Sequence, residues 1–177
     1  MSYFTERQLR LYITDSFTKS AEQTMIKEAS QTRNTIFLSF SHKDLDLAVG
    51  LKNYLASLKL DLYLDLFDSD LSIHTNRDTA RRIKNRIKNL NYFFLLLSNN
   101  SVLSRWVPWE LGIADGNKGV DKIFIVPVED SSGESYGNEY LQIYKRIEIA
   151  TNREVGMFEP NKSEGISISD FLKENML

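Results

Sequence analysis

The sequence SRWVPWELGIA, residues 104–114, places a carboxylate near the start of an expected helix. Trp106 and Glu110 are four residues apart, so in a helix they lie on the same face. Pro108 suits the first turn, because amides there have no intrahelical partner. The preceding run YFFLLLS, residues 92–98, is too short to cross a bilayer and is typical of a strand covered on both faces. We therefore predict that Glu110 lies beyond the carboxyl end of a central parallel strand, where open α/β sheets bind ligands.

Glu110 also has a simpler explanation. The helix macrodipole and the free amides of a first turn favour an acidic residue there without any further role. The surrounding composition favours a site, because Trp106 and Trp109 both precede the carboxylate within one turn. Both explanations stay open on the residues alone.

Length and composition exclude several classes of protein. The 177 residues suit one domain of ordinary size with an appendage. A net charge of −2 gives no general case for binding nucleic acid or an anionic membrane. Cysteine is absent, which excludes a disulfide framework and a thiolate site and fits a reducing cytoplasm. The sequence shows no secretory signal and no run of about 20 apolar residues, so we expect a soluble, cytoplasmic protein.

Residues 1–31 are predicted to form an N-terminal helix. Thr5 and Gln8 have the spacing of a capping box. Apolar residues then recur at every fourth position, at Leu9, Ile13, Phe17, Ala21 and Met25. Such a single apolar face suits either docking on the domain surface or contact with another protein chain.

Strands and helices alternate through the rest of the chain. This pattern predicts a doubly wound α/β fold, with a mostly parallel five-stranded sheet flanked by helices. Strands are expected at residues 35–41, 61–65, 92–98, 122–128 and 146–149. Helices are expected after a Ser41/Asp44 capping box to about residue 58, and at 77–90, 104–117 and 168–175. The main domain is expected at 33–150. A C-terminal segment at 151–177 is expected to carry the last helix, which packs on this domain. Pro127 is expected to end the hydrogen-bonded ladder of its strand.

The helix expected at residues 77–90 combines an apolar inner side with a basic outer side. The inner residues are Ala80, Ile83, Ile87 and Leu90. The outer residues are Arg77, Arg81, Arg82, Lys84, Arg86 and Lys88. Six cations suit a phosphate-bearing partner, although a charge run is more often a solvated face.

Several kinds of chemistry lack their residues in this chain. Neither a GxxxxGK[ST] loop nor a GxGxxG turn is present, so ordinary nucleotide hydrolysis and Rossmann-type hydride transfer have no phosphate cradle. His42 and His74 are too few for a zinc site or a Ser-His-Asp triad, and no metal site is expected. His42 lies in the first strand-to-helix turn, where a solvated histidine is the commoner case. What remains is carboxylate chemistry at Glu110, on the same sheet edge as the turn at 40–44 and the loop after Asp65.

These motifs together resemble the Toll/interleukin-1 receptor (TIR) domains, particularly the bacterial ones. The resemblance covers about residues 33–150 and implies the flavodoxin-like TIR fold. It depends on four stretches in order: FLSFSHKD at 37–44, YLD at 63–65, LLS at 96–98 and SRWVPWEL at 104–111. The second stretch opens the BB loop, and the last belongs to the helix that bears the acid in catalytic members.

The resemblance implies cleavage of NAD+, as a substrate and without a further cofactor. Enzymatic TIR domains break the nicotinamide–ribose bond and release nicotinamide with ADP-ribose or a cyclic isomer. Glu110 matches their catalytic glutamate, whose carboxylate would stabilise an oxocarbenium-like transition state as in glycoside hydrolysis. Nicotinamide leaves as a neutral molecule, so one carboxylate can suffice. The resemblance places contacts to NAD+ at Phe40, Ser41, His42, Asp44, Leu71 and Trp106.

The resemblance also implies partners. Active TIR assemblies form homo-oligomers or filaments through the BB loop, and Thoeris-type antiphage members make a diffusible nucleotide that reaches a separate effector. Family BB loops usually carry a glycine, whereas residues 67–76 contain none. Two other functions stay open: a non-catalytic TIR scaffold acting by homotypic binding, and a nucleoside deoxyribosyltransferase-like enzyme that uses a glutamate on N-glycosidic bonds. The Trp-x-x-x-Glu spacing favours an NAD+-cleaving enzyme.

Overall fold

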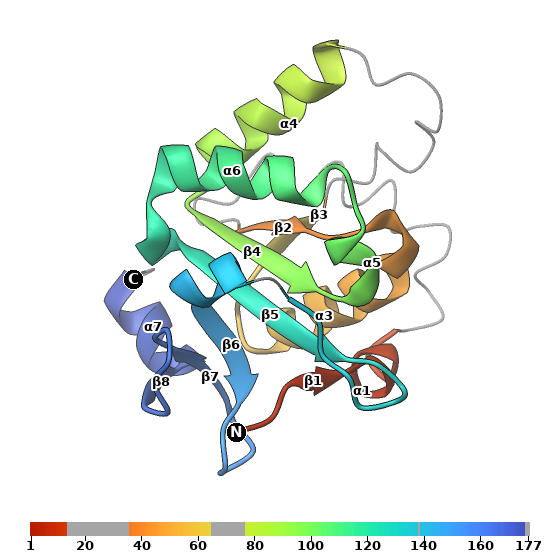
Figure 1. Cartoon of the computed structure of the whole chain (residues 1–177). Coiled ribbons are helices and arrows are strands. Elements are labelled where there is room, and N and C mark those ends of the chain that lie inside the picture. Colours follow the sequence, from red (N-terminus) through yellow and green to blue (C-terminus); the bar gives the residue numbers. More distant parts are fainter. Residues whose placement is uncertain (14–35, 65–76, 138, 176–177) are drawn as a thin grey trace.

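The computed structural model describes residues 1–13, 36–64, 77–137 and 139–175, and its elements form one mixed α/β unit (Figure 1). Its strands are β1 Phe4–Thr5, β2 Ile36–Ser39, β3 Leu62–Leu64, β4 Tyr92–Leu97, β5 Ile123–Glu129, β6 Lys145–Ile149, β7 Val155–Phe158 and β8 Gly165–Ser167. Its α-helices are α1 Glu6–Arg10, α3 Leu45–Ser57, α4 Arg77–Asn89, α5 Asn99–Val102, α6 Val107–Lys118 and α7 Ile168–Asn175. Three 3₁₀ turns are η1 His42–Asp44, η2 Val120–Lys122 and η3 Glu139–Ile143.

The described strands form one sheet in the order β3-β2-β4-β5-β6-β7-β8, with β1 paired to β5. The run from β3 to β6 is parallel, and β2 lies between β3 and β4. The chain therefore reverses its winding between β2 and β4. Crevices at such a reversal are where open α/β sheets bind ligands.

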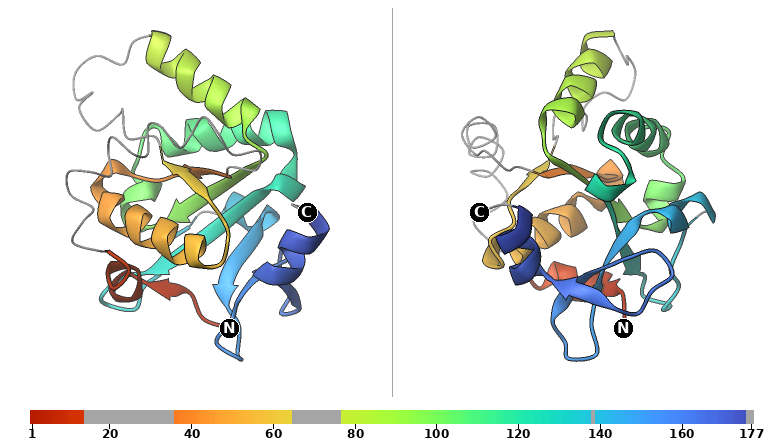
Figure 2. Two further views of the ribbon diagram at one scale, coloured as in Figure 1. Left: turned by 180° about the vertical axis from the view of Figure 1, so that it is seen from behind. Right: turned by 90° about the vertical axis from the view of Figure 1, so that its left-hand side faces the viewer.

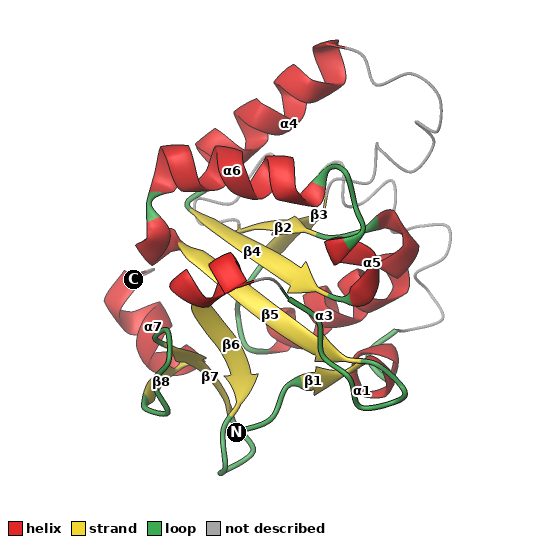
Figure 3. Ribbon diagram, in the orientation of Figure 1, coloured by secondary structure: helices red, strands yellow, loops and turns green. Residues whose placement is uncertain are grey.

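Helices cover both faces of this sheet (Figures 2 and 3). Alternate residues of β4 point to opposite sides: Tyr92 and Phe94 pack with α3 and α7, whereas Phe93 and Leu95 pack with α4 and α6. All six residues of β4 are buried, as expected for a central strand covered twice. The doubly wound, mostly parallel fold is therefore confirmed.

The expected number of strands is wrong, because the sheet has eight strands rather than five. Two additional strands, β7 and β8, continue from β6 as an antiparallel meander. The third, β1, pairs in parallel with the end of β5. The ladder between β4 and β5 ends at the pair Leu97–Pro127, as expected, although β5 itself continues because β1 pairs with its last two residues. The predicted C-terminal helix at 168–175 is confirmed as α7.

The first residues of the chain belong to the core. The Thr5 side chain accepts a hydrogen bond from the Gln8 amide at 3.1 Å, and the Gln8 side chain accepts one from the Thr5 amide at 2.8 Å, which confirms the capping box. The helix then ends at Arg10 rather than continuing, because successive i→i−3 hydrogen bonds tighten the chain into a turn. Residues 14–31 of the predicted helix lie outside the described residues.

The described part of this segment packs into the core. Phe4 is 2% exposed and Leu9 is 1% exposed, and both belong to the core on the α3 side of the sheet. The backbone of Leu9 approaches Gly50 of α3 so closely that a Cβ built on Gly50 would lie 2.1 Å from the Leu9 carbonyl oxygen. Only glycine therefore allows this contact between α1 and α3.

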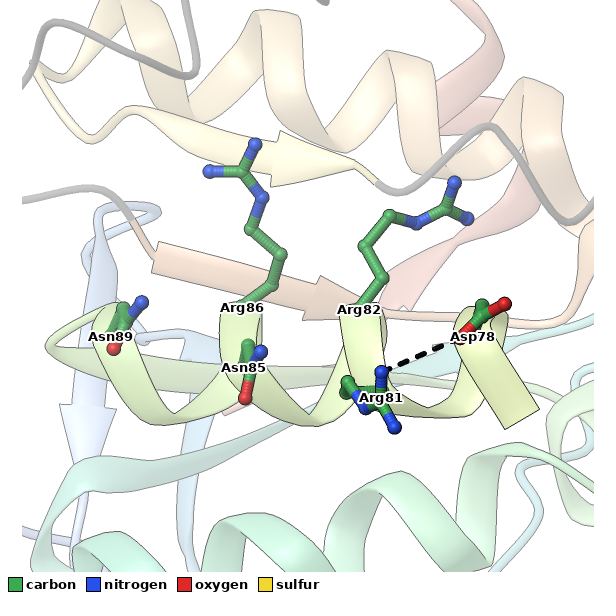
Figure 4. A pocket seen from close by; sticks show the side chains of 6 residues that line it. All are labelled: Asp78, Arg81, Arg82, Asn85, Arg86 and Asn89. Carbon is green, nitrogen blue, oxygen red and sulfur yellow. Dashed lines mark hydrogen bonds and ion pairs between the residues drawn. The ribbon is translucent and has the colours of Figure 1, made fainter.

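The basic helix α4 differs from the expectation in two of its cations. Ile83 and Ile87 are buried as predicted, but Arg82 and Arg86 are half-buried rather than on the outer side. Figure 4 shows both arginines leaving α4 on one side, and the Arg86 guanidinium lies 5.3 Å from the centroid of the Tyr63 ring on β3. A cation over an aromatic face is attractive, so Arg86 joins α4 to the sheet.

Candidate active site

Glu110 lies in the first turns of α6, where the sequence predicted it. Trp106 is the residue before the helix, and its carbonyl oxygen accepts the Glu110 amide at 2.9 Å. Val107, Leu111 and Ala114 anchor α6 in the core on its side of the sheet. Glu110 itself is only 7% exposed, so its carboxylate is held within the protein instead of on a solvated helix end.

The Glu110 carboxylate contacts the end of β2. The Ser39 hydroxyl donates a hydrogen bond to Glu110 Oε2 at 2.5 Å. Ile36 and Leu38 of β2 point towards α3, so Phe37 and Ser39 point towards α6. This alternation brings the last residue of β2 to the carboxylate.

A second buried carboxylate lies at the same edge of the sheet. Asp44 is 4% exposed and accepts hydrogen bonds from the Ser98 hydroxyl at 2.5 Å and from Asn100 Nδ2 at 2.7 Å. The predicted Ser41/Asp44 capping box is therefore wrong. Residues 42–44 form the turn η1, and Ser41 makes no side-chain cap. The Asp44 oxygens accept hydrogen bonds from Ser98 and Asn100 instead.

The remaining residues proposed to contact NAD+ occupy different environments. The Phe40 ring is 7% exposed, belongs to the core on the α3 side, and lies 5.8 Å from the His42 ring. Ser41 is buried, whereas His42 is half-buried. Trp106 is half-buried on the α6 side and meets Trp109 edge to face at 5.1 Å. Leu71 lies outside the described residues.

The structure thus brings the turn at 40–44 and Glu110 to one edge of the sheet, around the reversal between β2 and β4. Three partners of the two carboxylates were not predicted from the sequence: Ser39, Ser98 and Asn100. The sequence did contain an indication for Ser39. It is the one polar residue of β2, and it lies on the same face of the strand as Phe37. No such pattern marks Asn100, whose role depends on where α5 begins.

Among the described residues, no group of three or more His, Cys, Asp or Glu side chains is placed to hold a metal ion. None of the described helices is long and apolar enough to cross a membrane.

The fold and the site together define a class. A model of the TIR domain family matches residues 36–154, so the chain belongs to the TIR domain family. It is similar to the probable 3' cyclic ADP-D-ribose synthase ThsB' of Bacillus cereus (strain MSX-D12). The two are 35% identical over 153 residues, which covers 84% of this chain and 75% of that relative. The segment that forms β1 and α1 precedes the family match.

Proposed function

We propose that this protein cleaves the nicotinamide–ribose bond of NAD+ and converts the ADP-ribosyl group into a cyclic isomer or ADP-ribose, as a signal in cytoplasmic antiphage defence. The observation that carries this proposal is the buried Glu110 carboxylate, held by Ser39 at the sheet edge where α/β folds bind ligands. The name of the Bacillus cereus relative supports a cyclic product.

The proposed reaction needs little from the protein beyond this carboxylate. The electrons of the bond between the anomeric carbon and nicotinamide move onto the pyridine nitrogen, which becomes neutral as it leaves. Positive charge develops on the ribose, and the Glu110 carboxylate stabilises it. Capture by water gives ADP-ribose, and capture by a hydroxyl of the same molecule gives a cyclic isomer. In both cases the incoming hydroxyl loses a proton, for which Glu110 is the candidate acceptor.

Incubation with NAD+ followed by chromatography of the products tests this proposal. Nicotinamide and a cyclic or linear ADP-ribose product should appear with the native protein and disappear with Glu110→Gln. Unchanged NAD+ at every protein concentration would favour a TIR scaffold that acts by binding alone. Exchange of bases on a deoxynucleoside, with NAD+ untouched, would instead indicate a deoxyribosyltransferase-like enzyme.

We also propose that the active form is a homo-oligomer or filament whose product reaches a separate effector protein. The BB loop implied in assembly lies outside the described residues, but two charged surfaces support a head-to-tail contact. One is the exposed basic side of α4, formed by Arg77, Arg81, Lys84 and Lys88. The other is the acidic segment at the end of β5 and directly after it, formed by Glu129, Asp130 and Glu134.

The acidic segment keeps a defined shape and charge. Asp130 accepts hydrogen bonds from the Ser132 hydroxyl at 2.6 Å and the Tyr136 hydroxyl at 2.6 Å, and these bonds lower the pKa of its carboxyl group well below the usual range. Figure 1 shows α4 and the end of β5 at opposite ends of the molecule. A contact between different surfaces at opposite ends propagates instead of closing as a dimer, which suits a filament.

A further inference from the structure

Ser39 was not predicted as a site residue, but it contacts the candidate catalytic carboxylate directly. Its side chain is 1% exposed, and its hydroxyl reaches Glu110 Oε2 at 2.5 Å. It ends a strand of otherwise apolar residues, Ile36, Phe37 and Leu38. A polar group in such a position must be hydrogen-bonded to be tolerated, and here its partner is the candidate catalytic carboxylate.

We infer that Ser39 is a positioning residue that holds the Glu110 carboxylate in its reactive orientation. This inference depends on the proposed function, because it concerns the same site. An ionised carboxylate only accepts hydrogen bonds, so the hydroxyl proton of Ser39 stabilises the charged form that the transition state needs.

The contact also fixes geometry. The last torsion of a glutamate side chain is broad, so an unrestrained carboxylate samples many orientations. Ser39 stands on β2, whose residue 39 is paired with Leu95 of the central strand β4, whereas Glu110 stands on α6. The hydrogen bond therefore ties the carboxylate to the rigid sheet. A group held in place before the reaction does not have to reorient as charge develops.

The consequence should appear in the chemical step. A hydrogen bond to a charged group contributes enough that its loss slows a step about tenfold to a hundredfold. Ser39→Ala should therefore lower kcat for nicotinamide release by about that factor. The KM for NAD+ should change little, because Ser39 is buried behind the carboxylate and is not expected to contact the substrate. Ser39→Thr retains the hydroxyl and should recover most of the rate.

The test is steady-state release of nicotinamide from NAD+ by four proteins: native, Ser39→Ala, Ser39→Thr and the matched control Ile36→Val. The control shortens a buried side chain of the same strand on the opposite face, away from Glu110. Ile36→Val should lower the melting temperature about as much as Ser39→Ala does. Its kcat should nevertheless equal that of the native protein. If Ser39→Ala does not fold, Ser39→Cys, which is similar in size but a weak donor, replaces it.

A double mutant separates positioning from general damage. In a Glu110→Gln background, Ser39→Ala should cause no further fall in the residual rate, because the two residues act as one unit. Native kcat in Ser39→Ala would overturn the inference while leaving the proposed function intact, and so would equal losses in Ser39→Ala and Ile36→Val. A native protein that releases no nicotinamide would remove the proposed function itself, and with it this role for Ser39.

Discussion

A buried hydrogen bond joins Asp44, in the turn after β2, to Ser98, which directly follows β4. The Ser98 hydroxyl donates to Asp44 at 2.5 Å and also accepts the Ser101 amide at 3.0 Å as the cap of α5. Ser98 thus holds the turn η1 through Asp44 and also caps the start of α5. This pair therefore fixes two neighbouring segments at the sheet edge that also holds Glu110.

Asp44→Ala should lower stability by about 2 to 4 kcal/mol, because it removes a buried acceptor and leaves the Ser98 and Asn100 donors without it. Chemical denaturation followed by circular dichroism measures the loss. Asp46→Ala is the control, since its carboxylate pairs with Arg10 at 2.7 Å on the surface, where ion pairs contribute about 1 kcal/mol at most. Equal losses in the two variants would show that the Asp44 contacts do not stabilise the fold.

Glu110→Gln should lower nicotinamide release by several orders of magnitude, because the neutral amide cannot stabilise positive charge on the ribose. The fold should persist, since glutamine has nearly the same shape and can still accept from Ser39. Glu139→Gln, on an exposed acid of η3, should turn over normally. Native turnover in Glu110→Gln would contradict the proposed role of this residue.

Trp106→Ala should raise the KM for NAD+ more than it lowers stability. The indole is only half-buried, so its loss should cost less than the 3 to 5 kcal/mol typical of a core aromatic residue. Trp109→Ala is a matched control, because that ring packs edge to face on Trp106 but is 38% exposed. If calorimetry showed a full core-sized loss for Trp106→Ala with an unchanged KM, Trp106 would be a packing residue.

Gly50→Ala should destabilise the protein by more than about 2 kcal/mol, because its Cβ would lie 2.1 Å from the Leu9 carbonyl oxygen and force α1 away from α3. Gly116→Ala in α6 is the control. Nothing lies within 4 Å of its Cβ, so the better helix former should be neutral or stabilising by up to about 1 kcal/mol. Thermal unfolding compares the two, and equal melting temperatures would show that the first residues of the chain are loosely attached.

Specific activity should rise with protein concentration and fall with added salt, if the basic side of α4 binds the acidic segment of another copy. The double charge reversal Arg81→Glu and Lys84→Glu should lower activity and sedimentation coefficient without lowering the melting temperature. Lys59→Glu, an exposed change in the turn between α3 and β3, should have no such effect. A rate per molecule that stays constant over a hundredfold concentration range, with monomer throughout, would exclude this assembly.

The sequence predicted the elements whose patterns are local and long enough to read. The six buried residues of β4 and the helix α7 are of this kind. It did not predict β1 or β8, because their short sequences, FT and GIS, contain neither an apolar run nor a clear alternation. Their existence depends on distant partners, such as the close approach of Gly165 to the Met157 carbonyl oxygen.

The same distinction applies to the site. The spacing of Trp106 and Glu110 within one helix placed the carboxylate correctly, because neighbours in a helix are set by sequence distance. The partners of the carboxylates come from other elements: Ser39 is 71 positions from Glu110, and Ser98 is 54 positions from Asp44. No local pattern contains such pairings, and the capping box expected at Asp44 failed because Ser98 and Asn100 compete for the same oxygens.

The pairing of β1 with the end of β5 has a consequence for folding during synthesis on the ribosome. Phe4 and Thr5 are synthesised long before Val128 and Glu129, the residues with which they pair. Until most of the chain has been made, Phe4 and Leu9 have no complete core to enter. Contacts between residues so far apart in sequence form late, because the intervening chain must first be ordered. The insertion of β1 should therefore be among the last steps of folding, and a chaperone that holds nascent chains would find its binding segment there.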